Sequence, residues 1–199
     1  AVGRDGTLEF EEASVQGHEY GLASNGAKLQ VRGFTSVRAE RAGLGPTRST
    51  GRLEDLLVRE SESFGALQLV NSELEVQGFR VDGADGYGLA ATNGRLRARD
   101  GSITRMRSSE RFTGDGLHLR GVKADIEGVE VRGAPGAGVL AAQGAEVELR
   151  DVTLIQCQQA GLAVETLARV KAVGLEVRDT GGPALAVLRD GEVSADVLT

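Results

Sequence analysis

The feature that most constrains this chain is a short motif that recurs along its whole length at a nearly constant interval. The motif alternates apolar and variable residues around a central Gly or Asp, and its clear copies begin at Leu74, Leu96, Ala124, Val147 and Val170. Successive clear copies lie 22, 28, 23 and 23 residues apart, and a truncated copy follows after another 23 residues at Val193. Other copies begin at Leu8 and Leu29, and a degenerate one covers residues 53–58. A fixed period of this kind indicates a repeat architecture.

Each repeat also contains a second apolar segment, usually opened by glycine, as at residues 88–91, 116–119 and 161–164. One period therefore holds three short strands with period-two alternation, which are too short for amphipathic helices. Such strands are stable only when each is hydrogen-bonded to its counterparts in neighbouring repeats. The sequence predicts an all-β fold, a parallel β-helix of about eight or nine coils of 22–23 residues with three parallel sheets. We expect one domain over residues 1–199, belonging to a longer protein.

The central position of the motif alternates between glycine and an acidic residue. It holds Glu12, Gly33, Asp55, Gly78, Asp100, Gly128, Asp151 and Gly174. A sharp bend between two strands needs a residue that tolerates the left-handed backbone region, which Gly does freely and Asp better than most others. We therefore interpret the acids at this position as bend residues and not as metal ligands.

Composition excludes several other classes of protein. Gly accounts for 29 of 199 residues without a period of three, and 40% hydrophobic content with a net charge of -6 is unlike a disordered chain. Interspersed acidic charges predict no binding to nucleic acid, and the absence of a long apolar run predicts no membrane insertion. Cys157 is the only cysteine, which excludes an internal disulfide, and we interpret it as a small side chain in a turn. No cofactor or metal site is expected.

The complete repeat, a Gly-led strand followed by two strands around a Gly or Asp bend, resembles that of the pectate-lyase-like superfamily. The resemblance covers almost the whole chain and implies a right-handed coil, in agreement with the general preference of parallel crossovers. It also implies a secreted or cell-envelope location and an interaction with carbohydrate. Because the superfamily contains lyases, hydrolases, epimerases and non-catalytic stalks, the fold does not determine the activity.

The step of 28 residues marks the one clear departure from the period, at residues 104–115. We expect this segment to form a loop that protrudes from one corner, since insertions between repeats often border binding sites. It carries Arg105, Arg107 and Arg111, whose guanidinium groups could bind carboxylates, sulfates or phosphates. The alternative is a solvated loop whose arginines pair with Glu110 and with neighbouring coils.

Asp115 and His118 follow this loop, and Asp85 lies near the same corner one coil earlier. In superfamily members that cleave galacturonans, acids just before a Gly-led strand act as general acid and base, so the resemblance implies such a role for Asp115. The chain lacks the adjoining acid pairs, the Gly-His-Gly element and the clustered calcium-binding acids of those enzymes. We expect a non-catalytic scaffold or binding module that contacts a protein or an acidic polysaccharide. The alternative is a lyase or hydrolase that acts on a uronate-containing glycan through Asp115 and His118.

Self-association is a further expectation. The outward positions of the Gly-led strands form a stripe of small apolar residues: Ala23, Ala90, Leu140, Ala163 and Ala186. A flat apolar stripe is a candidate contact for a partner or a second copy. The two ends of the solenoid are a second candidate, because no capping segment is evident there. A tail at Val197 and Leu198 that folds over the last coil is the alternative at the C-terminal end.

Overall fold

The computed structural model describes residues 6–62 and 65–195, and this part of the chain is all β. The expected tail at Val197 and Leu198 lies outside these residues. The strands are β1 (Thr7–Gln16), β2 (Tyr20–Asn25), β3 (Lys28–Val37), β4 (Ala42–Thr47), β5 (Thr50–Ser61), β6 (Gly65–Ala84), β7 (Leu89–Thr104), β8 (Leu117–Arg120), β9 (Lys123–Arg132), β10 (Ala137–Ala142), β11 (Glu146–Arg150), β12 (Thr153–Ile155), β13 (Ala160–Glu165), β14 (Arg169–Val173), β15 (Glu176–Arg178), β16 (Leu185–Leu188) and β17 (Glu192–Ala195). In the described segments there is no helix of the length and apolarity that crossing a membrane requires.

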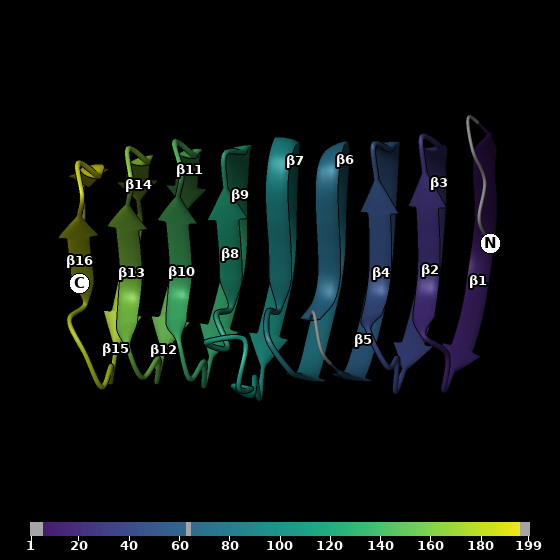
Figure 1. Ribbon diagram of the computed structural model, residues 1–199, viewed down its shortest axis with the longest axis horizontal. Coiled ribbons are helices and arrows are strands. Elements are labelled where there is room, and N and C mark those ends of the chain that lie inside the picture. The colour runs from purple at the N-terminus through teal and green to yellow at the C-terminus, as the bar shows by residue number, and fades with distance from the viewer. Residues whose placement is uncertain (1–5, 63–64, 196–199) are drawn as a thin grey trace.

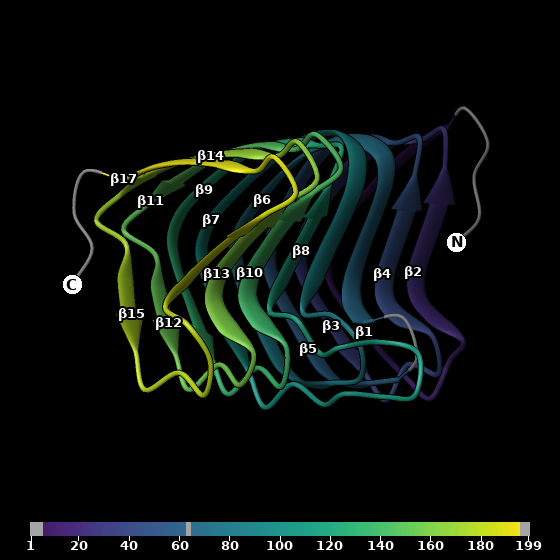
Figure 2. The same ribbon diagram turned by 60° about the vertical axis from the view of Figure 1, so that its left-hand side comes forward.

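All pairings between these strands are parallel, and each strand pairs with the equivalent strand of the neighbouring coil. The result is a β-solenoid of about eight turns, seen side-on in Figure 1 and obliquely in Figure 2. The predicted all-β parallel solenoid is thus confirmed. Long strands such as β6 run through several corners of a coil, which shows that the corners are bends and not loops.

Three faces enclose the core. The charged face comprises β11, β14, β17 and the stretches 7–11, 28–32, 50–54, 73–77, 95–99 and 123–127. After one bend residue the third face follows, with β12, β15 and the stretches 13–16, 34–37, 56–59, 79–82, 101–104 and 129–132. The small-residue face comprises β2, β4, β8, β10, β13, β16 and the stretches 65–70 and 89–92.

Alternate residues of every face point inward and form one continuous aliphatic core. Stacked columns of Leu, Val, Ile and Ala fill it, and Leu29, Leu44, Leu89, Leu117 and Leu149 are almost completely buried. Several glycines that open the small-residue strands face β-branched side chains of the third face: Gly43, Gly88, Gly116 and Gly161. A Cβ at Gly88 would overlap Ile103, and one at Gly116 would overlap Val131. These glycines are therefore required because two sheets approach closely at that corner.

The bend between the charged and third faces has the predicted conformation. Its occupants from Glu12 to Gly174 all have positive φ, with values between 51° and 66°. The alternation of acid and Gly along the stack also has a steric reason. A Cβ at Gly174 would lie 2.5 Å from Asp151 Oδ1, and one at Gly78 would lie 2.9 Å from Asp55 Oδ1. The side chain of each acid thus occupies the space over the glycine of the next coil.

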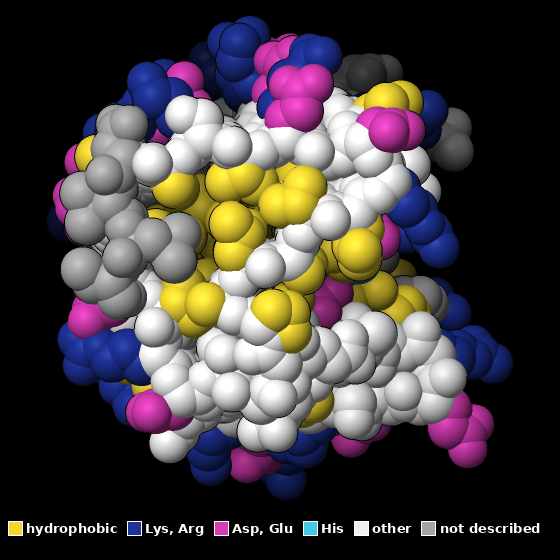
Figure 3. All heavy atoms as spheres, turned by 90° about the vertical axis from the view of Figure 1, so that its left-hand side faces the viewer, with side chains coloured by type: hydrophobic (Ala, Val, Ile, Leu, Met, Phe, Trp, Pro, Cys, Tyr) yellow, Lys and Arg dark blue, Asp and Glu magenta, His cyan; other side chains and the backbone are white. Residues whose placement is uncertain are grey.

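The ends of the described solenoid leave core residues partly uncovered. The half-buried hydrophobic residues that pack on the core all belong to the outermost coils: Leu8, Phe10, Ala13, Val15, Val177, Leu185 and Val193. Figure 3 looks onto the C-terminal end, where hydrophobic side chains gather in the middle of the cross-section and charged ones surround them. Val187 is 45% exposed and Leu188 56% exposed in the last coil.

We predict that Gly174→Ala destabilises the fold by about 1–3 kcal/mol, because Ala adopts positive φ only with strain and its Cβ would meet Asp151. The matched control is Gly133→Ala, at a similar φ of 71° but with nothing within 4 Å of the added Cβ. This control should be destabilised only by the backbone strain of Ala at positive φ, about 1 kcal/mol. Urea unfolding measures both variants, and equal losses would contradict the proposed contact with Asp151.

Candidate functional site

The candidate site lies where the 105–116 segment joins the third face to the small-residue face. This segment is a loop, as predicted, and it projects beside the corner of the solenoid in Figure 2. Met106 anchors it in the core with 4% exposure. Arg107 also forms an isolated parallel bridge with Asp85, so the loop begins as a continuation of the coil.

Asp115 and His118 lie together and are both buried. His118 Nδ1 is 2.8 Å from Asp115 Oδ2, and Asp115 Oδ1 accepts a hydrogen bond of 2.9 Å from the backbone N–H of Ala137 in the next coil. Asp115 is 2% exposed and His118 6% exposed. With Asp115 ionised, His118 carries its proton on Nδ1 and donates it to this carboxylate. Both carboxylate oxygens therefore have partners, Oδ1 in the next coil and Oδ2 in the same coil.

Two aromatic side chains cover this pair. The Tyr87 ring stacks on His118 with 4.0 Å between ring centroids, and Phe112 meets Tyr87 edge-on at 5.2 Å. Burial, reinforced by the negative charge of Asp115, raises the pKa of the Tyr87 hydroxyl above its usual value. Arg120 follows His118 on β8, and its Nε is buried without a hydrogen-bond partner in the described residues. The loop is thus fastened to the solenoid by an aromatic stack over the buried Asp115–His118 hydrogen bond.

The loop arginines pair with acids of the preceding coil. Arg105 Nε donates to Asp82 Oδ1 at 2.5 Å, and Arg107 Nε donates to Asp85 Oδ1 at 2.5 Å. The hydrogen bond from Arg105 holds the pKa of Asp82 below its usual value, and it outweighs the opposing effect of burial. The side chains of Arg105 and Arg107 remain 69% and 51% exposed, and Arg111 is exposed at the tip. Their unused donors therefore face solvent.

The structure brings the six predicted residues to one corner but separates them into two groups. Asp115 and His118 are buried, whereas Arg105, Arg107 and Arg111 are exposed on the loop and Asp85 lies partly exposed on the preceding coil, paired with Arg107. Tyr87 and Phe112 were missed by the sequence analysis. Their signal was available, since the chain has only 7 aromatic residues, 5 Phe and 2 Tyr, of which Phe112 lies within the single large insertion and Tyr87 lies one coil before it.

The small apolar stripe is interrupted in its middle. Register places Ala90, His118 and Leu140 side by side on three neighbouring strands. Ala90 and His118 are each 6% exposed, whereas Ala23, Ala163 and Ala186 are partly exposed. Gly45 lies next to Ala23 at the equivalent position of the neighbouring strand. The exposed part of the stripe therefore consists of two separate patches, one on each side of the candidate site.

The chain matches no protein-family model, and no curated protein is detectably similar to it in sequence. The class of protein defined by the structure is the parallel β-solenoid.

We predict that Asp115→Ala lowers the free energy of unfolding by about 1–3 kcal/mol, because the Ala137 N–H and the His118 ring lose their acceptor. Asp115→Asn is the matched control, since its amide oxygen can still accept from Ala137. Urea unfolding and trypsin cleavage at Arg111 measure the effect. We expect faster cleavage in Asp115→Ala than in Asp115→Asn; identical behaviour of both variants and the parent chain would refute this role.

We also predict that Cys157 is unreactive in the folded protein. It is fully buried, and burial raises the pKa of its thiol to about 11. At pH 8 about one thiol in a thousand is then ionised, and the thiolate is the reactive form. A colorimetric disulfide reagent should label Cys157 only in urea; rapid labelling of the native protein would show that this coil opens.

Proposed function

We propose that this chain is a non-catalytic β-helix module, a rigid scaffold that presents the 105–116 loop to an anionic partner. The repeat pattern supports kinship with the pectate-lyase-like superfamily, and we propose an acidic polysaccharide as the partner on this basis. A protein with an acidic segment has the same charge and is the alternative partner. The module would then bind its partner and hold it in place, and it would not catalyse a reaction.

One observation carries this proposal, namely that the acid at the corner is buried and hydrogen-bonded whereas the arginines of the loop are exposed. Asp115 is buried with both carboxylate oxygens hydrogen-bonded, so it holds the loop and is not accessible to a substrate. Glycoside hydrolysis needs two carboxyl groups about 5–10 Å apart on either side of the glycosidic bond. The exposed guanidinium groups of Arg105, Arg107 and Arg111, in contrast, suit carboxylate binding.

A second candidate function is a lyase or hydrolase that acts on uronate-containing glycans. The observation in its favour is the Asp115–His118 hydrogen bond, because a carboxylate that orients an imidazole is an arrangement found in general bases. In this alternative the loop would have to open before His118 could reach a glycan.

We predict binding without turnover on a panel of polyuronates. Calorimetric titration should detect binding that weakens with salt and that falls at least about tenfold when Arg105, Arg107 and Arg111 are all replaced by Ala. Replacement of the exposed Arg80 on the third face by Ala is the matched control and should leave binding unchanged. New reducing ends or unsaturated products that disappear in His118→Ala would overturn the proposal in favour of the enzyme. An absence of binding to every polyuronate would eliminate the glycan as partner.

A further inference from the structure

The charged face carries two outer columns of residues whose signs mostly alternate along the solenoid, with like neighbours at Arg95 and Lys123 and at Asp125 and Glu148. The first column is Thr7, Lys28, Thr50, Glu73, Arg95, Lys123, Glu146, Arg169 and Glu192, and the second is Glu9, Gln30, Arg52, Glu75, Arg97, Asp125, Glu148, Lys171 and Ser194. Together they hold 7 cations (Lys28, Arg52, Arg95, Arg97, Lys123, Arg169, Lys171) and 7 anions (Glu9, Glu73, Glu75, Asp125, Glu146, Glu148, Glu192). A groove of about 1220 Å³ runs along this face and is lined by residues of all its strands.

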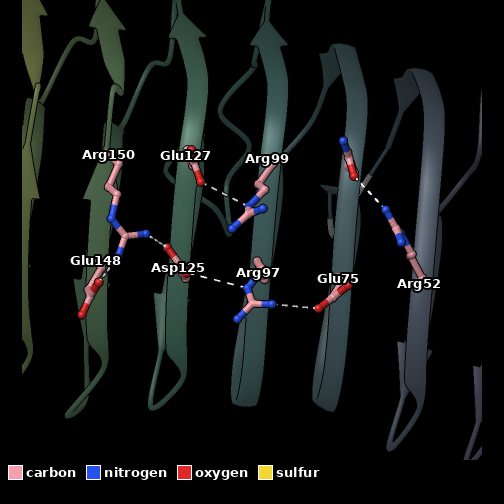
Figure 4. Close-up of polar contacts among 9 residues, drawn as sticks. Arg52, Glu75, Arg97, Arg99, Asp125, Glu127, Glu148 and Arg150 are labelled. Atoms are coloured by element: carbon pink, nitrogen blue, oxygen red, sulfur yellow. Dashed lines mark hydrogen bonds and ion pairs between the residues drawn. The ribbon is translucent and has the colours of Figure 1, made fainter.

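Many of these charges are already paired within the chain. Figure 4 shows Arg97 between Glu75 and Asp125, and Arg150 between Asp125 and Glu148. Arg150 belongs to a third column of this face, next to the bend, which comprises Glu11, Arg32, Glu54, Gln77, Arg99, Glu127, Arg150 and Val173. In the described residues five charges of the two columns make no ion pair: Glu9, Lys28, Glu73, Arg95 and Lys171. All five are exposed. They are the charges of these two columns that remain available to a partner.

We propose that the charged face binds the charged face of a second copy of this chain, in an antiparallel dimer. Alternating columns are complementary to themselves when one copy is reversed and displaced by an odd number of coils. A two-fold axis along the strands, midway between stretches 73–77 and 95–99, gives this register. The first column of one copy then faces the first column of the other, and the second faces the second. The two solenoids run in opposite directions.

In this register no like charges meet in the two columns. Three charges face a neutral residue: Arg169 faces Thr7, Lys123 faces Thr50 and Glu148 faces Gln30. The facing pairs of opposite sign are Glu73 with Arg95, Glu75 with Arg97, Arg52 with Asp125, Lys28 with Glu146 and Glu9 with Lys171, each occurring twice by symmetry. Every one of the five unpaired charges receives an opposite charge. A shift of one coil would instead bring Arg95 against Arg95, or Glu73 against Glu73, so the charges specify the register.

In the third column, beside the bend, the same register brings like charges together. There Glu54 would face Glu127, and Arg32 would face Arg150. Each of these four charges has an ion-pair partner in its own chain: Arg52 for Glu54, Arg99 for Glu127, Asp55 for Arg32 and Asp125 for Arg150. These encounters are therefore between paired charges, and they weaken the dimer less than bare like charges would.

The size of the face suits a specific dimer. Eight facing strands at ~4.8 Å spacing and about 17 Å in length cover roughly 650 Å² on each copy. The total of roughly 1300 Å² lies within the range of stable protein interfaces. Because the contact consists of exposed ion pairs, its strength must depend on ionic strength.

Sedimentation equilibrium of the chain tests this proposal. We expect a dimer at about 0.01 M salt, where the Debye length is about 30 Å, and a monomer at about 1 M, where it is about 3 Å. Glu73→Arg and Arg95→Glu should each raise the dimer Kd at least about tenfold, since each places like charges opposite one another twice. An equimolar mixture of the two variants should form a heterodimer. The arginine introduced at position 73 of one chain then faces the glutamate introduced at position 95 of the other, and the native Arg95 faces the native Glu73.

The controls separate this face from the other surfaces. Glu73 and Arg95 are exposed and make no ion pair within the described part of the chain, and each reversal places one pair of like charges on neighbouring strands. Urea unfolding should therefore show that both variants remain folded and lose no more than about 1 kcal/mol. Arg80→Glu, on the third face, should dimerise like the parent chain. A monomer at low salt, a dimer that resists salt and both reversals, or a mixture that stays monomeric would each overturn the proposal. Polyuronate binding through the loop is independent of every one of these outcomes.

Discussion

The interaction on which the whole structure depends is the parallel backbone hydrogen bonding between one coil and the next. Most strands are too short to be stable alone, and their partners are always the equivalent strands one coil away. Each position in the repeat therefore has copies of itself as its nearest neighbours. This explains why inward positions form columns of aliphatic residues and why aromatic residues are rare. A ring in one coil must be accommodated by the coils above and below it, as Phe79 is by Gly101.

The same constraint governs the charges. If every coil carried the same ionised residue, like charges would be stacked about 4.8 Å apart along the solenoid. The chain mostly avoids this by changing sign from coil to coil. Two acids follow each other at Asp125 and Glu148, where Arg150 binds both, and two cations follow each other at Arg95 and Lys123, where Lys123 pairs with Glu146. Exposed ion pairs contribute little individually, but here they oppose any slippage of one coil against the next. An alternation that fixes the register within one chain also defines a register between two chains.

Repetition decided what could be predicted from the sequence. The strands, the faces, the inward columns and the bend at Asp100 or Gly128 were readable because each signal occurs in every coil. The arrangement at Asp115 occurs once. Nothing periodic indicates that its carboxylate reaches the Ala137 N–H one coil away, or that Tyr87 covers His118. Such contacts depend on the path of a loop that has no counterpart elsewhere in the described chain.

At the two other corners of the coil, too, the sequence does not predict the backbone conformation. Arg38, Glu60 and Gln156 have positive φ at the corner that follows the third face, and Arg48 and Asn71 do so after the small-residue face. Arg, Glu and Gln give no signal for this conformation, which costs a non-Gly residue roughly 1–2 kcal/mol. The strain is tolerated because hydrogen bonds to neighbouring coils fix the backbone on both sides of each corner, as Arg38 N–H to Arg59 and Arg48 N–H to Val70 illustrate. The stack therefore imposes the bends, and residue type matters most where, as at Gly174, a neighbouring side chain fills the space a Cβ would need.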